Sequence, residues 1–195
     1  HSFAFDPVLN DGLRNALEKI PEQVRKKKQI LVYGRPGTER NAFNLVVAAL
    51  KKWVFMQPDI EEWEILSAGE MHRTVALGNG KELTSVGKLS IEEYANMLEE
   101  SYAGISLMCS PHPSYPPLEM SVFDVKTITN TYANKDLKEF NENIISLDNI
   151  SPMNIAKHLV EICKSYQTEV RHIAANPLYV KNDHVFDFVE DIKKI

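Results

Sequence analysis

Two arginines stand in one short loop, and their spacing suits the binding of a diphosphate. Arg35 follows the apolar run Ile30–Tyr33 and Gly34, and Arg40 comes five positions later, at the expected start of a helix. A helix N-terminus presents free N–H groups and the positive end of its dipole to an anion. Two guanidinium groups add paired donors and two positive charges. We therefore expect Arg35 and Arg40 to bind a diphosphate, with solvated surface arginines as the alternative.

A second loop, residues 110–117, is rich in proline and leads into a short helix that carries Glu119. The prolines predict a rigid, pre-shaped loop. The carboxylate of Glu119 could accept two hydrogen bonds from the neighbouring hydroxyls of a ribose. The alternative is that it only compensates the helix dipole. His112, in the same loop, is either a general base or a polar surface residue.

Several other chemistries are not supported by the sequence. The loop after Gly34 contains Gly37 but lacks the third glycine of a dinucleotide fingerprint and the Gly-Lys-Ser/Thr of a P-loop. No His, Asp or Glu cluster has the spacing of a metal site. No nucleophile–histidine pair can be assembled, and the two cysteines, Cys109 and Cys163, are expected to be buried free thiols. We therefore expect no metal, and the catalytic residue stays unknown.

Apolar strand-like runs alternate with amphipathic helical patterns along the chain. Strands are expected at 30–33, 63–66, 83–86, 103–108, 126–129 and 144–145, and helices at 13–20, 43–54, 90–98, 118–123, 152–162 and 185–192. This alternation predicts an α/β fold with a doubly wound parallel, Rossmann-like sheet. Ligands of such sheets bind at the carboxyl ends of the strands, so the loops after the first four strands are the candidate site.

The overall composition fits one globular domain. The chain has 195 residues and a formal net charge of −5, which argues against a nucleic-acid partner. No stretch approaches the ~20 apolar residues of a transmembrane segment. The basic run Arg25–Lys28 is expected to be a solvated loop or helix end. A cytoplasmic location is expected, with the inner face of the membrane as a further option.

Taken together, three stretches of the sequence resemble the C-terminal, donor-binding domain of retaining glycosyltransferases with the GT-B fold, and rhamnan-synthesis-type rhamnosyltransferases above all. The stretches are 30–50, with its Gly-Arg pair and second basic residue, 87–94, and 110–130. The resemblance spans most of residues 28–165. It implies one half of a GT-B fold, and a function in transferring a sugar, with rhamnose as a candidate, from a nucleoside-diphosphate donor to a cell-surface polysaccharide.

The resemblance also implies roles for individual residues. Arg35 and Arg40 would contact the donor diphosphate, Glu119 would bind the ribose, and the backbone of Lys88 and Leu89 would receive the base. The remaining residues would shape the sugar and phosphate pocket: Gly34, His112, Ser114, Tyr115, Pro116, Pro117 and Leu118. The donor would carry dTDP or UDP, and no separate cofactor is implied.

The sequence departs from the family pattern at one position that bears on the sugar. The family places two glutamates eight positions apart, whereas this chain has Glu119 and, in place of the first, Pro111. The missing carboxylate leaves the donor sugar open, although a deoxy sugar is compatible with a less polar pocket. Asp124 also stands where the family often has glycine.

A complete GT-B enzyme has two such domains, so this chain is expected to be a donor-domain fragment that is inactive without its N-terminal acceptor domain. We divide it into an opening segment and hinge (1–28), the nucleotide-sugar-binding domain (29–170) and a C-terminal helical tail (171–195). The alternatives are a non-catalytic nucleotide-binding or docking module derived from a glycosyltransferase, and an unrelated nicotinamide-dependent Rossmann-like domain.

Overall fold

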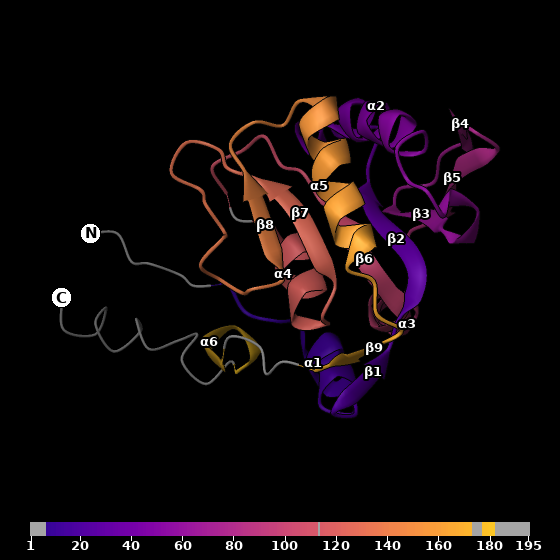
Figure 1. Cartoon of the computed structure of the whole chain (residues 1–195). Coiled ribbons are helices and arrows are strands. Elements are labelled where there is room, and N and C mark those ends of the chain that lie inside the picture. Colours follow the sequence, from indigo (N-terminus) through magenta and orange to yellow (C-terminus); the bar gives the residue numbers. More distant parts are fainter. Residues whose placement is uncertain (1–6, 113, 173–176, 182–195) are drawn as a thin grey trace.

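A mostly parallel sheet forms the centre of the computed structural model, which describes residues 7–112, 114–172 and 177–181 (Figure 1). Within these residues the main sheet has seven strands in the order β4-β5-β3-β2-β6-β7-β8. All neighbouring pairs are parallel except β4 with β5. The strands are β2 (Lys27–Gly34), β3 (Glu64–Gly69), β4 (Val75–Gly78), β5 (Lys81–Gly87), β6 (Ser101–Ile105), β7 (Lys126–Asn130) and β8 (Ile144–Leu147).

Helices cover both faces of this sheet, and each face has its own apolar core. The helices are α1 (Asp11–Leu17), α2 (Phe43–Trp53), α3 (Ile91–Glu100), α4 (Tyr115–Val122), α5 (Pro152–Lys164) and α6 (Pro177–Val180), with 3₁₀ turns η1 (Glu39–Asn41) and η2 (Ile60–Glu62). One core lies under α2 and α5, which pack against each other, and the second lies under α1, α3 and α4. The expected doubly wound α/β fold is confirmed.

The sequence explains where several of these helices begin. Ser90 and Glu93 form the expected capping box at the start of α3, in which each side chain accepts a hydrogen bond from the other residue's backbone N–H. Ser151 caps α5 by accepting from Asn154 N. In α4 the helix begins at Tyr115, earlier than the expected residue 118, because proline is compatible with the first helical turn, where no backbone N–H bond is lost.

The structure also contains strands that the sequence pattern did not indicate. β4 pairs with β5 through a turn in which Asn79 and Gly80 have positive φ angles of 50° and 71°. β1 (Gln23–Arg25) pairs with β9 (Glu169–Arg171) in a separate antiparallel sheet. This small sheet brings the segment before β2 beside the segment after α5. The helix expected at 185–192 lies outside the described residues.

The basic run before β2 differs from the expectation of a solvated loop. Lys26 is only 1% exposed, and its ammonium donates to the carbonyl oxygens of Leu98, at 3.1 Å, and Phe123, at 2.6 Å. Burial lowers the pKa of Lys26 to about 8, although the negative charge of Asp124 opposes this shift. Lys26 is therefore a buried link between the ends of α3 and α4.

The strand order locates the candidate site. The chain runs from β2 outward to β3 and β5, then crosses back to β6 on the other side of β2. In doubly wound sheets ligands bind outside the carboxyl ends of the strands at this reversal point. The loops that follow β2 and β6 meet there, and these loops carry the two arginines and the proline-rich segment.

Candidate functional site

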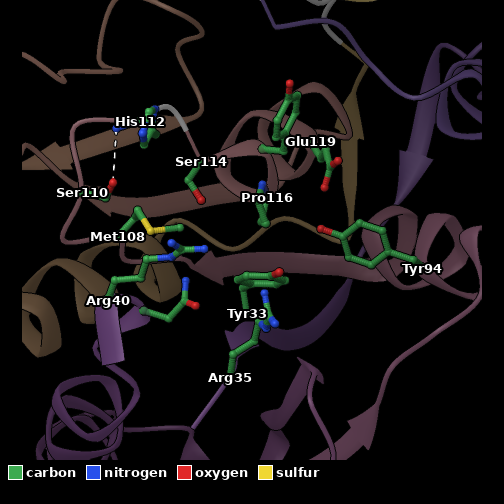
Figure 2. A pocket seen from close by; sticks show the side chains of 12 residues that line it. Tyr33, Arg35, Arg40, Tyr94, Met108, Ser110, His112, Ser114, Pro116 and Glu119 are labelled. Carbon is green, nitrogen blue, oxygen red and sulfur yellow. Dashed lines mark hydrogen bonds between the residues drawn. The ribbon is translucent and has the colours of Figure 1, made fainter. Parts of the chain in front are cut away.

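A cavity of about 420 Å³ lies at the reversal point, and we call it the arginine pocket. Its walls combine the loop after β2, the loop after β6, α3 and the start of α4 (Figure 2). The lining residues are Tyr33, Arg35, Arg40, Asn41, Tyr94, Met108, Ser110, His112, Ser114, Tyr115, Pro116 and Glu119. The two arginines and the glutamate, far apart in sequence, thus line one cavity.

A second cavity of about 370 Å³, the turn pocket, shares Tyr33, Arg35 and Tyr94 with the arginine pocket. Its other lining residues are Ala68, Gly69, Lys88, Leu89, Ser90 and Ile91. These residues come from the end of β3 and from the turn between β5 and α3. The two cavities therefore adjoin at Tyr33, Arg35 and Tyr94, and Lys88 and Leu89 line the turn pocket only.

Hydrogen bonds from three elements fix the loops around the arginine pocket. Cys109 N donates to the carbonyl oxygen of Arg40 at 2.7 Å, which joins the loop after β6 to the loop after β2. Asn130 exchanges hydrogen bonds with the backbone of Met108, at 2.8 and 3.2 Å. Lys135 donates to the carbonyl oxygen of Met108 at 2.6 Å. The protein's own hydrogen bonds thus hold this wall of the pocket.

The sequence pattern placed Arg40 at the start of the helix that follows β2. In the structure Arg40 instead lies in the 3₁₀ turn η1, just before α2. Ala42, between η1 and α2, has a positive φ of 50°, a conformation that is uncommon for a residue other than glycine. This bend separates η1 from the helix axis of α2. In Figure 2 the guanidinium group of Arg40 points into the cavity, toward Ser114.

The start of α4 offers fewer backbone donors than an ordinary helix N-terminus. Ser114 is the N-cap residue, but its side chain makes no capping hydrogen bond. Pro116 and Pro117 occupy the first turn, and proline has no N–H. An anion in this cavity would therefore depend mainly on the arginine side chains.

Glu119 is a partly buried residue in the wall of the arginine pocket. Burial raises its pKa to about 7, and the hydroxyl of Tyr94 opposes this rise in part. Figure 2 shows the Tyr94 hydroxyl pointing toward the Glu119 carboxyl. A buried carboxyl at a cavity wall is a frequent feature of binding sites.

Polar atoms without partners also mark the arginine pocket. The hydroxyl of Ser114 and the side-chain oxygen of Asn41 are buried and make no hydrogen bond with the described part of the chain. Buried polar groups are normally paired, so unpaired groups that line a cavity are available to a ligand. Tyr33, Asn41 and Met108 were not among the expected site residues.

Three of the expected pocket residues do not line either cavity. Leu118 and Pro117 are buried, and Leu118 belongs to the core beneath α3 and α4. Gly34 is buried at the end of β2, where a Cβ atom would lie 1.9 Å from the Ser67 hydroxyl oxygen. Packing of the chain explains these three residues, whereas Arg35, Arg40, His112, Ser114, Tyr115, Pro116 and Glu119 line the arginine pocket. The ligands that these residues contact stay predictions.

No helix among the described residues is both long and apolar enough to cross a bilayer. Within the same residues, no three His, Cys, Asp or Glu side chains are grouped so that they could hold a metal ion. Cys109 and Cys163 are free thiols, and Cys163 is buried as expected, whereas Cys109 is only partly buried.

Solved structures share the fold of this domain at low sequence identity. The chain superimposes on WaaG, a glycosyltransferase involved in lipopolysaccharide biosynthesis, with a TM-score of 0.55 and 10% identity. The match covers 83% of this chain and 47% of WaaG. TarM gives a TM-score of 0.54 at 10% identity, over 85% of this chain and 36% of that one. The domain thus has the fold of about half of such an enzyme, and the expected half of a GT-B fold is confirmed.

Sequence relatives point to the same group of proteins. The O-antigen biosynthesis protein RfbC of Myxococcus xanthus is 35% identical over 127 residues, which are 65% of this chain but only 10% of that protein. The sequence model of the WsaF C-terminal domain matches residues 28–160, which include the loops of both pockets up to α4 and the whole central sheet. With more than half of its length matched in this way, the chain belongs to the WsaF C-terminal domain family.

Proposed function

We propose that this domain binds a nucleoside-diphosphate sugar and is the donor-binding half of a glycosyltransferase that builds a cell-surface polysaccharide. The observation that carries the proposal is the meeting of Arg35, Arg40 and Glu119 at one cavity, the arginine pocket. Two cations suit a diphosphate, and a carboxylate suits the hydroxyls of a pentose. The adjoining turn pocket has room for the base beside the backbone of Lys88 and Leu89.

In this proposal Arg35 is central because it lines both cavities. A nucleotide would place its base in the turn pocket, its ribose near Glu119 and Tyr94, and its diphosphate between Arg35 and Arg40. The sugar would then extend toward His112 and Ser114. The donor would carry dTDP or UDP, and rhamnose is the sugar that the family resemblance suggests.

The reaction would proceed mainly by stabilisation of the leaving diphosphate. As the glycosidic bond to the phosphate breaks, negative charge grows on the departing oxygen, and pre-placed guanidinium groups can stabilise that charge without reorganising. The acceptor and the group that activates it would come from an N-terminal domain of the same enzyme. We place the reaction in the cytoplasm, at the inner face of the membrane, where nucleotide sugars meet a growing polysaccharide.

A thermal-shift panel tests this function. The domain is heated with dTDP, UDP and GDP, alone and as their sugars, at concentrations up to a hundredfold above the dissociation constant. A ligand at that excess adds about 2.7 kcal/mol to the free energy of unfolding. We expect stabilisation by dTDP or UDP, and no stabilisation by any of the three would contradict the proposal.

A non-catalytic binding module is the second candidate function. Pro111 favours it, because this exposed residue stands where the family resemblance places a donor-contacting carboxylate. The protein with its N-terminal domain present separates the two functions, through assays of donor hydrolysis and of sugar transfer. Nucleotide binding without turnover on any donor would favour the module.

A further inference from the structure

The hydroxyl of Tyr94 lies in a fixed position beside Glu119. Tyr94 is in the first turns of α3, where the capping box of Ser90 and Glu93 sets the start of the helix. Tyr94 N donates to the carbonyl oxygen of Ser90 at 2.9 Å, so the backbone of this residue is already in the helical ladder. The side chain lines both the arginine pocket and the turn pocket. Its ring is therefore held where the two cavities meet.

This hydroxyl has no other use in the described part of the protein. It is buried, and it makes no hydrogen bond of normal geometry. A buried hydroxyl without a partner costs free energy, and natural proteins seldom leave one unless a ligand or a local rearrangement satisfies it. Figure 2 shows that the hydroxyl is directed at the Glu119 carboxyl.

We propose that Tyr94 is a positioning residue, whose hydroxyl donates a hydrogen bond to the Glu119 carboxylate and so holds this carboxylate oriented toward the ribose. This inference rests on the proposed function. A carboxylate has about four acceptor positions, so one bond from Tyr94 leaves enough for two ribose hydroxyls. Hydrogen bonds of this kind are often long in a ligand-free protein and tighten in the complex.

The bond would also hold Glu119 in its charged form. Burial raises the pKa of Glu119 to about 7 even though Tyr94 acts in the opposite direction. A hydrogen bond to the charged form of an acid favours that form. Without Tyr94 a larger fraction of Glu119 would be protonated at pH 7, and a protonated carboxyl is a weaker acceptor for ribose.

The other groups around Glu119 come from several elements, and their charges bear on its titration. Arg35 and Arg40 line the same cavity. Three further groups lie on separate elements, namely Tyr33 on β2, Tyr115 on α4 and His112 on the proline-rich loop. The hydroxyl of Tyr179 on α6 is buried, and the charge of Glu119 contributes to raising the pKa of Tyr179. Among these, Tyr94 is the hydroxyl that influences the titration of Glu119 directly.

The first experiment uses the ligand-free protein and the Tyr94→Phe variant, which keeps the ring and the shape of both cavities. The pKa of Glu119 is followed by carbon NMR of the side-chain carboxyl, assigned with Glu119→Gln. We expect the pKa to rise in Tyr94→Phe by roughly half to one pH unit, the effect of losing one hydrogen bond to the charged form. Tyr132→Phe removes a hydroxyl from a tyrosine that is 42% exposed and lines neither cavity, and it should leave the titration unchanged.

The second experiment measures the affinity for dTDP and UDP between pH 5.5 and 8.5 by calorimetry. In Tyr94→Phe we expect an affinity about tenfold lower at pH 7, as for one lost hydrogen bond to a charged group, with recovery toward higher pH. In a Glu119→Gln background the same substitution should have little effect. The role of Tyr94 would be overturned if the wild type binds nucleotide and Tyr94→Phe shows the same affinity and the same Glu119 pKa. The proposed function would be overturned if the wild type itself binds no nucleoside diphosphate.

Discussion

The carboxylate of Glu70 accepts a hydrogen bond from the backbone N–H of Gly37, with donor and acceptor 3.1 Å apart. Glu70 follows β3, and Gly37 lies between Arg35 and Arg40, so the bond joins the loops of two adjacent strands. Glu70 is itself fixed, because its N–H donates to the carbonyl oxygen of Gly34 at 3.0 Å. The loop that carries both arginines is therefore held from its side by a neighbouring carboxylate.

We predict that Glu70→Ala weakens the binding of nucleoside diphosphates by roughly threefold to tenfold, the equivalent of one hydrogen bond of ~0.5–1.5 kcal/mol. The removed negative charge acts in the opposite direction, because it repels the diphosphate. Glu70→Gln separates the two effects, since it removes the charge but keeps an acceptor oxygen. Calorimetry should show near wild-type affinity for Glu70→Gln, and a Glu70→Ala variant that binds as well as Glu70→Gln would show that the hydrogen bond does not matter.

Arg35→Ala and Arg40→Ala should each lower the affinity for nucleoside diphosphates by tenfold or more. Each loses charge-assisted hydrogen bonds worth ~1.5–3 kcal/mol. Affinity for the nucleoside without phosphates should change much less in Arg40→Ala, because Arg40 lines the arginine pocket only, whereas Arg35 also lines the turn pocket. The matched control is Arg73→Ala, an exposed arginine that lines neither cavity. Unchanged binding in both pocket variants would exclude the diphosphate assignment.

The sequence predicted β2 and β6 well because each contains an apolar run, Ile30–Tyr33 in β2 and residues 102–105 in β6. It did not indicate β4, a four-residue strand at the sheet edge in which only Leu77 is buried. The Asn79-Gly80 pair was the signal that could have revealed this hairpin. The position of Lys26 was predicted wrongly because a run of basic residues usually indicates a solvated segment. The prediction holds for its neighbours Arg25 and Lys27, which are exposed.

For the site, the sequence identified the charged residues better than the aromatic residues that line the cavities beside them. Arg35, Arg40 and Glu119 could be named because loops that follow parallel strands meet at one edge. Tyr33 and Tyr94 could not be placed, because their position depends on which sheet face the end of β2 presents and on how α3 packs over it. Asp124 stands where the family often has glycine. The backbone of Asp124 has a positive φ of 58°, a conformation that glycine adopts readily, which explains the glycine of the family at this position.

Glu119→Gln should stabilise the ligand-free domain above pH 7 while weakening nucleotide binding at least tenfold. The pKa of Glu119 is raised from 4.5 to about 7 in the folded state, so between these pH values the folded protein binds more protons than the unfolded one. The free energy of unfolding of the wild type therefore falls as pH rises from 4.5 to 7, by up to about 3 kcal/mol. Urea titrations at pH 4.5 and 8 test this, and an equal difference between variant and wild type at both pH values would contradict it.

Lys26→Met should destabilise the domain by about 3 kcal/mol at pH 7, because the carbonyl oxygens of Leu98 and Phe123 and the carboxylate of Asp124 lose a buried cation. Burial lowers the pKa of Lys26 from 10.5 to about 8, so between these pH values the unfolded state binds more protons than the folded state. The contribution of Lys26 to the free energy of unfolding of the wild type therefore rises with pH over this range. Lys26→Met lacks that contribution. The neighbouring Lys27→Met breaks only an exposed ion pair with Glu100 and should change stability by less than ~1 kcal/mol. Urea unfolding at pH 7 and 9.5 compares the three proteins, and similar midpoints for Lys26→Met and Lys27→Met would show that the buried ammonium does not connect α3 to α4 in any way that stabilises the fold.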